Sequence, residues 1–459
     1  MGSAERMKVA AAICSEQARM RPVVCVVSAM SKVTDLLLDS LRKAEAGDRA
    51  DLDSNLKVLR ERHRAVCSDL LGTDMARATA ALSEMDVLLN EFARIANGIL
   101  MLGERPPRSI DEAIAIGERL SALLLASYLE SEGVRAGAIN ASKVVVTDAV
   151  FGNASPLMDQ TRDRCNAMLR PMLDDGAIPI VTGFNGATAD GRPTTLGRGG
   201  SDFSASILAS ALDAAELWIW TDVDGIMSTD PRVVEDARVL DEVTYNEAAE
   251  LAYNGAKVLH PRTLAPLEEK KIPVWSKNSF NLAAPGTKIV PKLSTEPKGA
   301  RAVTSMKNVA LIAIEPAAGG LSGTRLMARA MDALARANAE ILAITSSSYR
   351  QSFCFLVRND ELRLVLDHLE DGLSLELAHG YSRPIEVDED VALIAVVGEG
   401  MRGAQGMAGR IFTAISSVDV NIIAIAQGSS EITIAAVVRK AGVDRAVRAI
   451  HSECGMSEG

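Results

Sequence analysis

The stretch from Thr194 to Ser206, TTLGRGGSDFSAS, combines hydroxyl, guanidinium and carboxylate groups with two adjacent glycines. Glycine lets a backbone approach an anion closely, and a guanidinium can bind a carboxylate or phosphate through two parallel hydrogen bonds. The GGSD portion alone is equally typical of a Gly-rich turn in which Ser201 or Asp202 caps a helix. The residues with chemical potential are Arg198, Gly199, Gly200, Ser201 and Asp202.

A second stretch, LWIWTDVDGIMSTDPR from Leu217 to Arg232, places carboxylates and hydroxyls directly after an apolar strand pattern. This arrangement suits the edge of a nucleotide site, but DVDG alone is also typical of a calcium-like loop or a simple turn. The stretch LAYNGAKVLHPRTLAPL, Leu251 to Leu267, adds a lysine in a Gly-containing loop. Together the two stretches predict a phosphate-handling region.

These motifs together resemble those of the aspartate kinases within the amino-acid kinase family. TTLGRGGSD is similar to their aspartate-binding signature, and TDVDG, MSTDPR and GAKVLHPR are similar to their ATP-binding half. The resemblance implies transfer of phosphate from ATP, with Mg²⁺, to the side-chain carboxylate of L-aspartate, which yields 4-phospho-L-aspartate. This is the first step toward lysine, threonine, methionine and diaminopimelate.

The resemblance also assigns roles to single residues. Arg198 would bind a substrate carboxylate, Asp202 would orient cationic groups or the substrate ammonium, and Lys257 would reach the phosphates. It implies no protein-held metal. The implied aspartate-binding residues are Ser28, Thr34, Glu118, Arg198, Gly199, Gly200 and Ser201. The implied ATP-binding residues are Thr221, Asp222, Met227, Asp230, Arg232, Lys257 and Val258.

Local sequence supports simpler roles for two of these positions and for a neighbouring histidine. Thr34 could be the N-cap of a helix, and Glu118 could match a helix dipole near the start of its helix. His260, next to the proposed phosphate loop, is interpreted as a packed, hydrogen-bonded histidine and not as a base.

The implied chemistry needs no general base, because the aspartate side chain is already ionised at neutral pH. The difficulty is to bring two anions together, so positive charge and positioning must supply the catalysis. Aspartate kinases begin with a strand and a Lys-Phe-Gly-Gly-Thr-Ser loop, and this sequence starts just past that point, with a helix capped by Ser3. We expect an upstream start, and a loss of about 3 to 4 kcal/mol of transition-state stabilisation, several hundredfold in rate, without that loop.

The rest of the first 295 residues alternates between strand and helix patterns. Strands are predicted at 23–27, 144–146 and 178–181, and helices at 159–173 and, strongly amphipathic, at 116–133. Residues from about 41 to 105 form a predicted helical insertion. The resemblance implies an α/β/α sandwich of the amino-acid kinase type over residues 1–295, followed by a linker or edge strand at 296–308.

An internal repeat of about 80 residues follows, in which VALIAIEPAAGGLSG recurs loosely as VALIAVVGEGMRGAQ. Each copy reads strand, Gly-rich loop, helix, strand, strand, helix. This resembles tandem ferredoxin-like (βαββαβ) ACT domains, expected at 309–388 and 389–459. Residues 300–305 could supply the strand that the second copy lacks, which would interleave the two domains.

The resemblance implies an amino-acid effector, with lysine or threonine as candidates. Gln427 and Glu431 are the expected effector ligands. Leu342, Ser346 and Arg350 stand where polar or acidic ligands are expected in the first copy, so an altered response, as in a specialised isozyme, is a second interpretation.

Composition excludes several classes of protein. A formal charge of −11, with acids and bases interleaved, argues against nucleic-acid or membrane partners. Six scattered cysteines without a CxxC pair suggest neither a zinc site nor a disulfide framework. The expectations are a cytoplasmic location and a homodimer or higher homo-oligomer joined through ACT domains.

Two other functions remain open. A non-catalytic, ACT-bearing amino-acid-sensing subunit would keep the aspartate pocket without transferring phosphate, although it would have no need for the ATP-side motifs. Another amino-acid kinase, acting on glutamate or acetylglutamate, is disfavoured by TTLGRGGSD and by the ACT pair.

Overall fold

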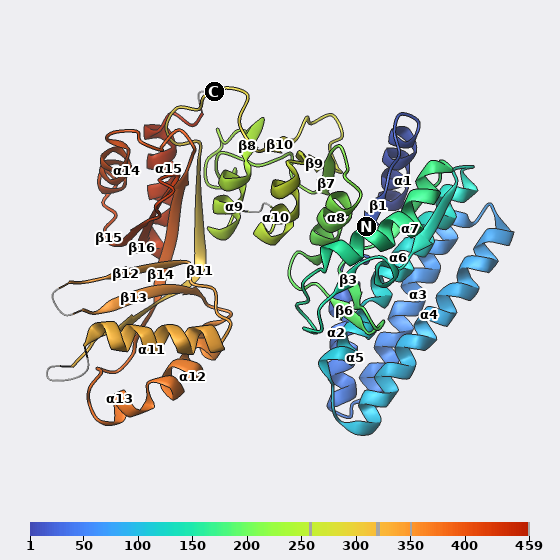
Figure 1. Ribbon diagram of the computed structural model, residues 1–459, viewed down its shortest axis with the longest axis horizontal. Helices are drawn as coiled ribbons and strands as arrows, with labels where there is room; N and C mark the ends of the chain where they lie inside the picture. Colours follow the sequence, from blue (N-terminus) through green and yellow to red (C-terminus); the bar gives the residue numbers. More distant parts are fainter. Residues whose placement is uncertain (257–258, 318–321, 349–350, 458–459) are drawn as a thin grey trace. The chain divides into compact units, whose positions relative to one another are not determined.

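The computed structural model describes residues 1–256, 259–317, 322–348 and 351–457 (Figure 1). These residues form two compact units, one of residues 1–222 and 259–283 and the other of residues 223–258 and 284–459.

The first unit is built around a parallel sheet with strand order β1-β4-β2. Alternate residues of β4 point to opposite faces, as the period of a strand requires. Ile178 and Ile180 pack among α1 to α6, whereas Val181 packs with α7 and α8. The sheet is therefore covered by helices on both faces. Its strands are β1 (Cys25–Val27), β2 (Ala136–Ile139) and β4 (Ile178–Thr182), and the helices named here include α1 (Ala4–Ala18), α6 (Ile116–Ser131), α7 (Met158–Asp174) and α8 (Gly200–Ala211).

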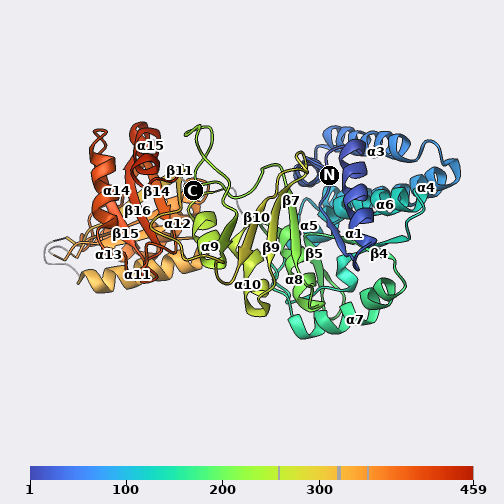
Figure 2. The ribbon, with the colours of Figure 1, turned by 90° about the horizontal axis from the view of Figure 1, so that it is seen from above.

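Helix α6 corrects one prediction. The sequence predicted an amphipathic helix at 116–133, but most of its residues are buried. It contacts α1, α3 and α4 as well as β2 and β4, so little of its surface is left for solvent (Figure 2). A helix that is apolar on nearly all sides is expected where neighbours surround it.

Residues from about 41 to 105, predicted as a helical insertion, are mostly helical, but the first of the three helices there begins earlier, at Val33, and their status as an insertion stays a prediction. α2 (Val33–Glu45), α3 (Arg49–Leu71) and α4 (Met75–Leu102) pack against one another. Asp48 and Asp74 cap α3 and α4 by accepting hydrogen bonds from the backbone N–H groups three residues later. Helix α5 (Pro107–Ile114) then leads through Ala115 directly into α6.

A second small sheet of the first unit, with order β3-β5-β6, precedes the Gly-rich stretch. β3 (Val146–Thr147) is shorter and later than the predicted strand at 144–146, because a 3₁₀ turn occupies Ala141–Lys143. β5 (Asn185–Thr188) and β6 (Pro193–Thr195) form an antiparallel hairpin. The other elements of this unit are β7 (Leu217–Thr221), β9 (Val274–Asn278), which pairs with β7 in parallel, and α10 (Pro261–Lys270).

The second unit contains the internal repeat as one six-stranded sheet, with order β12-β13-β11-β14-β16-β15. Helices α11 and α12 pack beside β11 and β13, and α14 and α15 pack beside β14 and β16 (Figure 1). The elements of the repeat are β11 (Ala302–Ile314), α11 (Gly323–Arg336), β12 (Ala343–Ser346), β13 (Phe353–Arg358), α12 (Leu362–Gly372), α13 (Ser374–Ala378), β14 (Glu386–Val397), α14 (Met407–Ser416), β15 (Ile422–Gln427), β16 (Thr433–Arg439) and α15 (Val443–Glu453).

Strand β11 joins the two copies of the repeat. Residues 309–314 pair with β13 of the first copy, and residues 302–306 pair with 393–397 of β14 in the second. The first part of β11 thus extends the second copy, which is the interleaving that residues 300–305 were predicted to allow. β11 runs through the boundary placed at 308, and the domain boundaries themselves stay a prediction.

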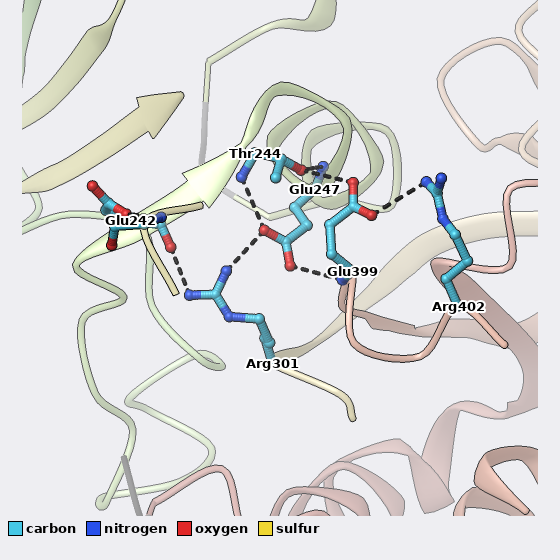
Figure 3. A network of polar contacts seen from close by, with 7 residues as sticks. Glu242, Thr244, Glu247, Arg301, Glu399 and Arg402 are labelled. Atoms are coloured by element: carbon cyan, nitrogen blue, oxygen red, sulfur yellow. Dashed lines mark hydrogen bonds and ion pairs between the residues drawn. The ribbon is translucent and has the colours of Figure 1, made fainter. Parts of the chain in front are cut away.

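A buried polar network ties the repeat to two further elements of the second unit, β8 (Glu242–Thr244) and α9 (Tyr245–Tyr253) (Figure 3). The Glu247 side chain is only 2% exposed and accepts hydrogen bonds from Thr244 N, Arg301 Nη1 and Glu399 N, each at 2.9 Å. Arg301 Nη2 also donates to Glu242 O at 2.6 Å. Because Glu247 has hydrogen-bond partners on both carboxylate oxygens, its burial is compensated.

All six cysteines are free thiols. No helix in the described part of the chain is both long enough and apolar enough to cross a membrane.

Candidate active site

One cavity of about 470 Å³ in the first unit gathers the predicted aspartate-binding residues. Two segments and one helix position form its walls: the loop after β1 with the start of α2, Glu118 of α6, and the Gly-rich stretch after β6. The lining residues are Ser28, Ala29, Met30, Ser31, Lys32, Thr34, Asp35, Glu118, Phe184, Gly197, Arg198, Gly199, Gly200, Ser201 and Asp202.

Glu118 lines this cavity, and its carboxyl group is only partly hydrogen-bonded. One carboxylate oxygen, Oε1, accepts a hydrogen bond from Ala29 N at 3.2 Å. The other, Oε2, is buried and has no hydrogen-bond partner among the described residues. Burial raises the pKa of Glu118 to about 8, and the Ala29 hydrogen bond lowers it by a smaller amount. Such a carboxylate is poised to accept a cation, because an incoming positive charge would supply the missing partner.

The raised pKa of Glu118 predicts how pH affects stability. Between pH 4.5, the ordinary value, and about pH 8, the folded chain holds a proton that the unfolded chain has lost. The free energy of unfolding therefore falls as the pH rises through this window. In Glu118→Gln this contribution is absent, so the variant should gain stability relative to the parent as the pH rises toward 8.

Urea unfolding at several pH values measures this effect, with tryptophan fluorescence as the signal. Trp218, Trp220 and Trp275 all lie in the first unit, so they report on the unit that contains Glu118. Glu132→Gln, at an exposed position just after α6, is the control. Parallel pH profiles for the parent and Glu118→Gln would contradict the raised pKa.

The Gly-rich stretch forms a tight turn at the start of α8. Gly199 has a φ of 68°, and a Cβ there would lie 2.8 Å from the Cβ of His260. A Cβ on Gly200 would lie 2.4 Å from the ring of Phe184. Both positions therefore need glycine, the first for conformation and space and the second for space. Gly200 N donates to Gly197 O at 3.1 Å, which closes the turn.

The simpler interpretation of this stretch, a helix capped by Ser201 or Asp202, is wrong. The N-cap of α8 is Gly199, without a side-chain cap, and Ser201 and Asp202 lie inside the first helical turn. Their side chains are thus left to line the cavity, next to the positive end of the helix dipole. Burial raises the pKa of Asp202 to about 6.

The loop after β1 gives a similar correction. Thr34 is not an N-cap, because α2 begins at Val33 and its N-cap is Lys32. Lys32 has a φ of 63°, in the left-handed region, and it has no side-chain cap hydrogen bond. The lining of the cavity thus includes two cationic side chains, Lys32 and Arg198.

Lys32, Asp35 and Phe184 line the cavity but were missed by sequence reasoning. A lysine in a polar loop looks like any surface lysine, and the left-handed backbone at Lys32 leaves no local signal. Phe184 follows β4, and its part in the cavity depends on packing against Gly200. His260 accepts a hydrogen bond from Arg262 N at 3.3 Å, as expected of a packed histidine.

The predicted ATP-binding residues lie in different parts of the chain. Thr221 and Asp222 belong to the first unit, where Thr221 O accepts hydrogen bonds from Ser279. Met227, Asp230 and Arg232 belong to the second, where Arg232 pairs with Asp230 at 2.6 Å. Lys257 and Val258 lie outside the described residues. The ATP site therefore stays a prediction.

The predicted effector ligands lie near the ends of strands in the six-stranded sheet. Gln427 ends β15, and Glu431 Oε2 accepts a hydrogen bond from Gly403 N at 2.8 Å. Ser346 ends β12 and Leu342 N donates to Leu356 O, whereas Arg350 lies outside the described residues. Within the ranges that the structure covers, no cluster of three or more His, Cys, Asp or Glu side chains could hold a metal ion.

Comparison with known proteins places the chain in a family. Residues 1–278 match the amino acid kinase family, and residues 394–454 match the ACT domain. The lysine-sensitive aspartokinase 3 of Escherichia coli is 32% identical, over 98% of this chain and 95% of that protein. The chain belongs to the aspartokinase family.

Other aspartokinases agree with this assignment. The bifunctional aspartokinase/homoserine dehydrogenase 1 of Arabidopsis thaliana is 35% identical over 100% of this chain, which spans only 50% of that protein's length. The crystal structure of E. coli aspartokinase III in complex with aspartate and ADP matches with a TM-score of 0.83, at 31% identity, over 98% of this chain and 97% of that chain. The aspartokinase fold predicted from the sequence, an α/β kinase domain followed by ACT-type repeats, is confirmed.

Proposed function

We propose that the chain is an ATP:L-aspartate phosphotransferase whose amino-acid substrate binds in the cavity between Glu118 and Arg198. The observation that supports this proposal is that two groups complementary to an amino acid line the same 470 Å³ space: the carboxyl group of Glu118, one oxygen of which has no hydrogen-bond partner among the described residues, and the guanidinium of Arg198. An amino acid carries the complementary charges, an ammonium and a carboxylate. Aspartate is the proposed substrate because it has a second carboxylate, and because the Gly-rich turn resembles the aspartate-binding signature of the aspartate kinases.

In this proposal the residues of the chain bind and orient and do not remove a proton. Glu118 accepts the substrate ammonium, which favours the ionised form of its carboxyl group. Arg198 binds one substrate carboxylate, and Ser201 and the Gly199 turn define the end of the pocket. Asp202 keeps the cationic groups oriented beside the acceptor carboxylate. The substrate's other carboxylate then faces the nucleotide as a nucleophile that is already ionised.

ATP is the proposed phosphate donor. The choice of residues proposed to bind ATP rests on motif resemblance. These residues are Thr221, Asp222, Met227, Asp230, Arg232, Lys257 and Val258. Mg²⁺ would arrive with the phosphates of ATP and lower their negative charge, as is usual where a protein provides no dedicated cage of ligands. The proposal also includes a lysine or threonine effector, a homo-oligomer joined through the ACT domains and a cytoplasmic location.

An ADP-release assay with a panel of amino acids tests this function. We expect ADP formation by the 459-residue chain to depend on L-aspartate and not on glutamate or acetylglutamate. Calorimetry with aspartate runs beside it. Aspartate binding without ADP release would favour the sensing-subunit alternative.

Lys32 should contribute to catalysis as the second cation of the cavity. Lys32→Gly should lower kcat/KM by about ten- to a hundredfold, since a charge-assisted hydrogen bond contributes roughly 1.5 to 3 kcal/mol. Because Lys32 has a φ of 63°, glycine fits its backbone without strain, so the variant should fold at least as stably as the parent. Steady-state kinetics and thermal unfolding measure the two effects.

Lys271→Gly is a matched control. Lys271 is also exposed, also has a left-handed backbone, with a φ of 56°, and lies in the first unit, but it does not line the cavity. Both variants should show a similar change in stability, and only Lys32→Gly should lose activity. Equal kinetics in the two variants would remove Lys32 from the site.

A further inference from the structure

We propose that Asp111 is a positioning residue that holds the Glu118 and Arg198 walls of the cavity at a fixed separation, and so sets affinity for the amino-acid substrate. The inference rests on the proposed function for its substrate, but its geometry does not. Asp111 does not line the cavity.

Asp111 connects the two walls through short, buried hydrogen bonds. It lies on α5, which continues through Ala115 into α6, the helix that carries Glu118. Its Oδ2 accepts from Thr195 N at 2.9 Å, and its Oδ1 accepts from Thr195 Oγ1 at 2.8 Å. Thr195 ends β6, three residues before Arg198. Both Asp111 and Thr195 are 1% exposed.

The same carboxylate also fixes a third segment. Asp111 Oδ2 accepts from Gly152 N at 2.8 Å, and Ala154 N, two residues further on, donates to Thr195 O at 2.8 Å. Arg262 of α10 reinforces this segment, because its guanidinium donates to Leu196 O at 3.2 Å and to Ala154 O at 3.3 Å. The chain is thus anchored up to two residues before Arg198.

Burial of the Asp111 carboxyl group costs more folding free energy than a purely structural role would explain. Its described hydrogen-bond partners are all neutral, and burial raises its pKa although three hydrogen bonds oppose the shift. A buried carboxylate without a cationic partner costs folding free energy. It does, however, hold several donors at fixed positions with one rigid group, and a small displacement of binding groups can cost up to about a hundredfold in rate.

Hydrogen exchange and kinetics of Asp111→Asn test the proposal together. The amide keeps the shape but places an N–H₂ group against N–H donors. We expect faster exchange in peptides that cover residues 115–120 and 193–203, and an increase in KM for aspartate of about ten- to a hundredfold while KM for ATP changes less than about twofold. Thr195→Val, which removes only the hydroxyl donor, should give a smaller increase, and Thr195→Ser should behave as the parent.

Thr161→Val is the matched control. Thr161 is also fully buried in the first unit and its Oγ1 accepts from Val146 N at 3.0 Å, but it does not line the cavity. A purely structural role for Asp111 would lower the melting temperature as in Thr161→Val and leave KM for aspartate and the exchange of both walls unchanged, which would overturn the proposal. Faster exchange of both walls in a chain that never phosphorylates aspartate would instead support the positioning role and refute the proposed function.

Discussion

Arg198→Ala should lower kcat/KM for aspartate by about a hundred- to a thousandfold, because a substrate carboxylate would lose its counter-charge beside the nucleotide phosphates. Arg198 is exposed at the cavity, so the variant should unfold at the temperature of the parent. Arg198→Lys should recover only part of the activity, since an ammonium group keeps the charge but not the planar pair of donors. Steady-state kinetics with varied aspartate measure both.

Arg192→Ala is the control for this prediction. Arg192 lies six residues earlier, is partly exposed and forms an ion pair with Asp190 at 2.9 Å, but it does not line the cavity. Its replacement should leave kcat/KM within about twofold of the parent, as is usual for surface changes. If Arg198→Ala were as active as Arg192→Ala, the substrate would not bind at the Gly-rich turn.

Glu247→Ala should destabilise the second unit by about 3 kcal/mol or more, because it leaves a mostly buried guanidinium without its partner. The Arg301 side chain is 19% exposed and the Glu247 side chain is 2% exposed. The change also removes the acceptors for Thr244 N and Glu399 N. We expect the loss to concentrate in α9, β8 and the first part of β11.

Hydrogen exchange is the suitable measurement, because it reports directly on α9 and β11, whereas the three tryptophans lie in the first unit. Peptides from α9 and β11 should exchange faster in Glu247→Ala than in the parent. Glu250→Ala, on the same helix but partly exposed, controls for the change in helix propensity. Unchanged exchange in α9 and β11 would show that the network contributes little.

The structure brings the residues that the sequence singled out into one cavity, because they occur in short motifs whose chemistry is local, and their role in binding aspartate stays a prediction. Arg198, Gly199 and Asp202 are adjacent in the chain, and their shared cavity with Glu118 follows from the family resemblance. The period of the internal repeat likewise predicted the two halves of the six-stranded sheet, because each strand and helix of the repeat buries its own apolar face.

What the sequence did not predict depends on contacts between distant segments. The burial of α6 requires the helical insertion on one side and the sheet on the other. Asp111 looks like a surface acid of a short helix until Thr195, 84 residues away, donates to it. The N-caps of α2 and α8 were misassigned because Lys32 and Gly199 have left-handed backbone conformations, and at Lys32 the residue type gives no local signal of this conformation.

The central claim is that this cavity holds L-aspartate while its side-chain carboxylate is phosphorylated. The most direct measurement is ¹³C and ³¹P NMR of L-[4-¹³C]aspartate incubated with ATP, Mg²⁺ and the chain, compared with Arg198→Ala. We predict an acyl phosphate signal coupled to carbon 4 in the parent, and its loss in the variant. Aspartate that binds but stays unmodified, or a phosphate on carbon 1, would contradict the account.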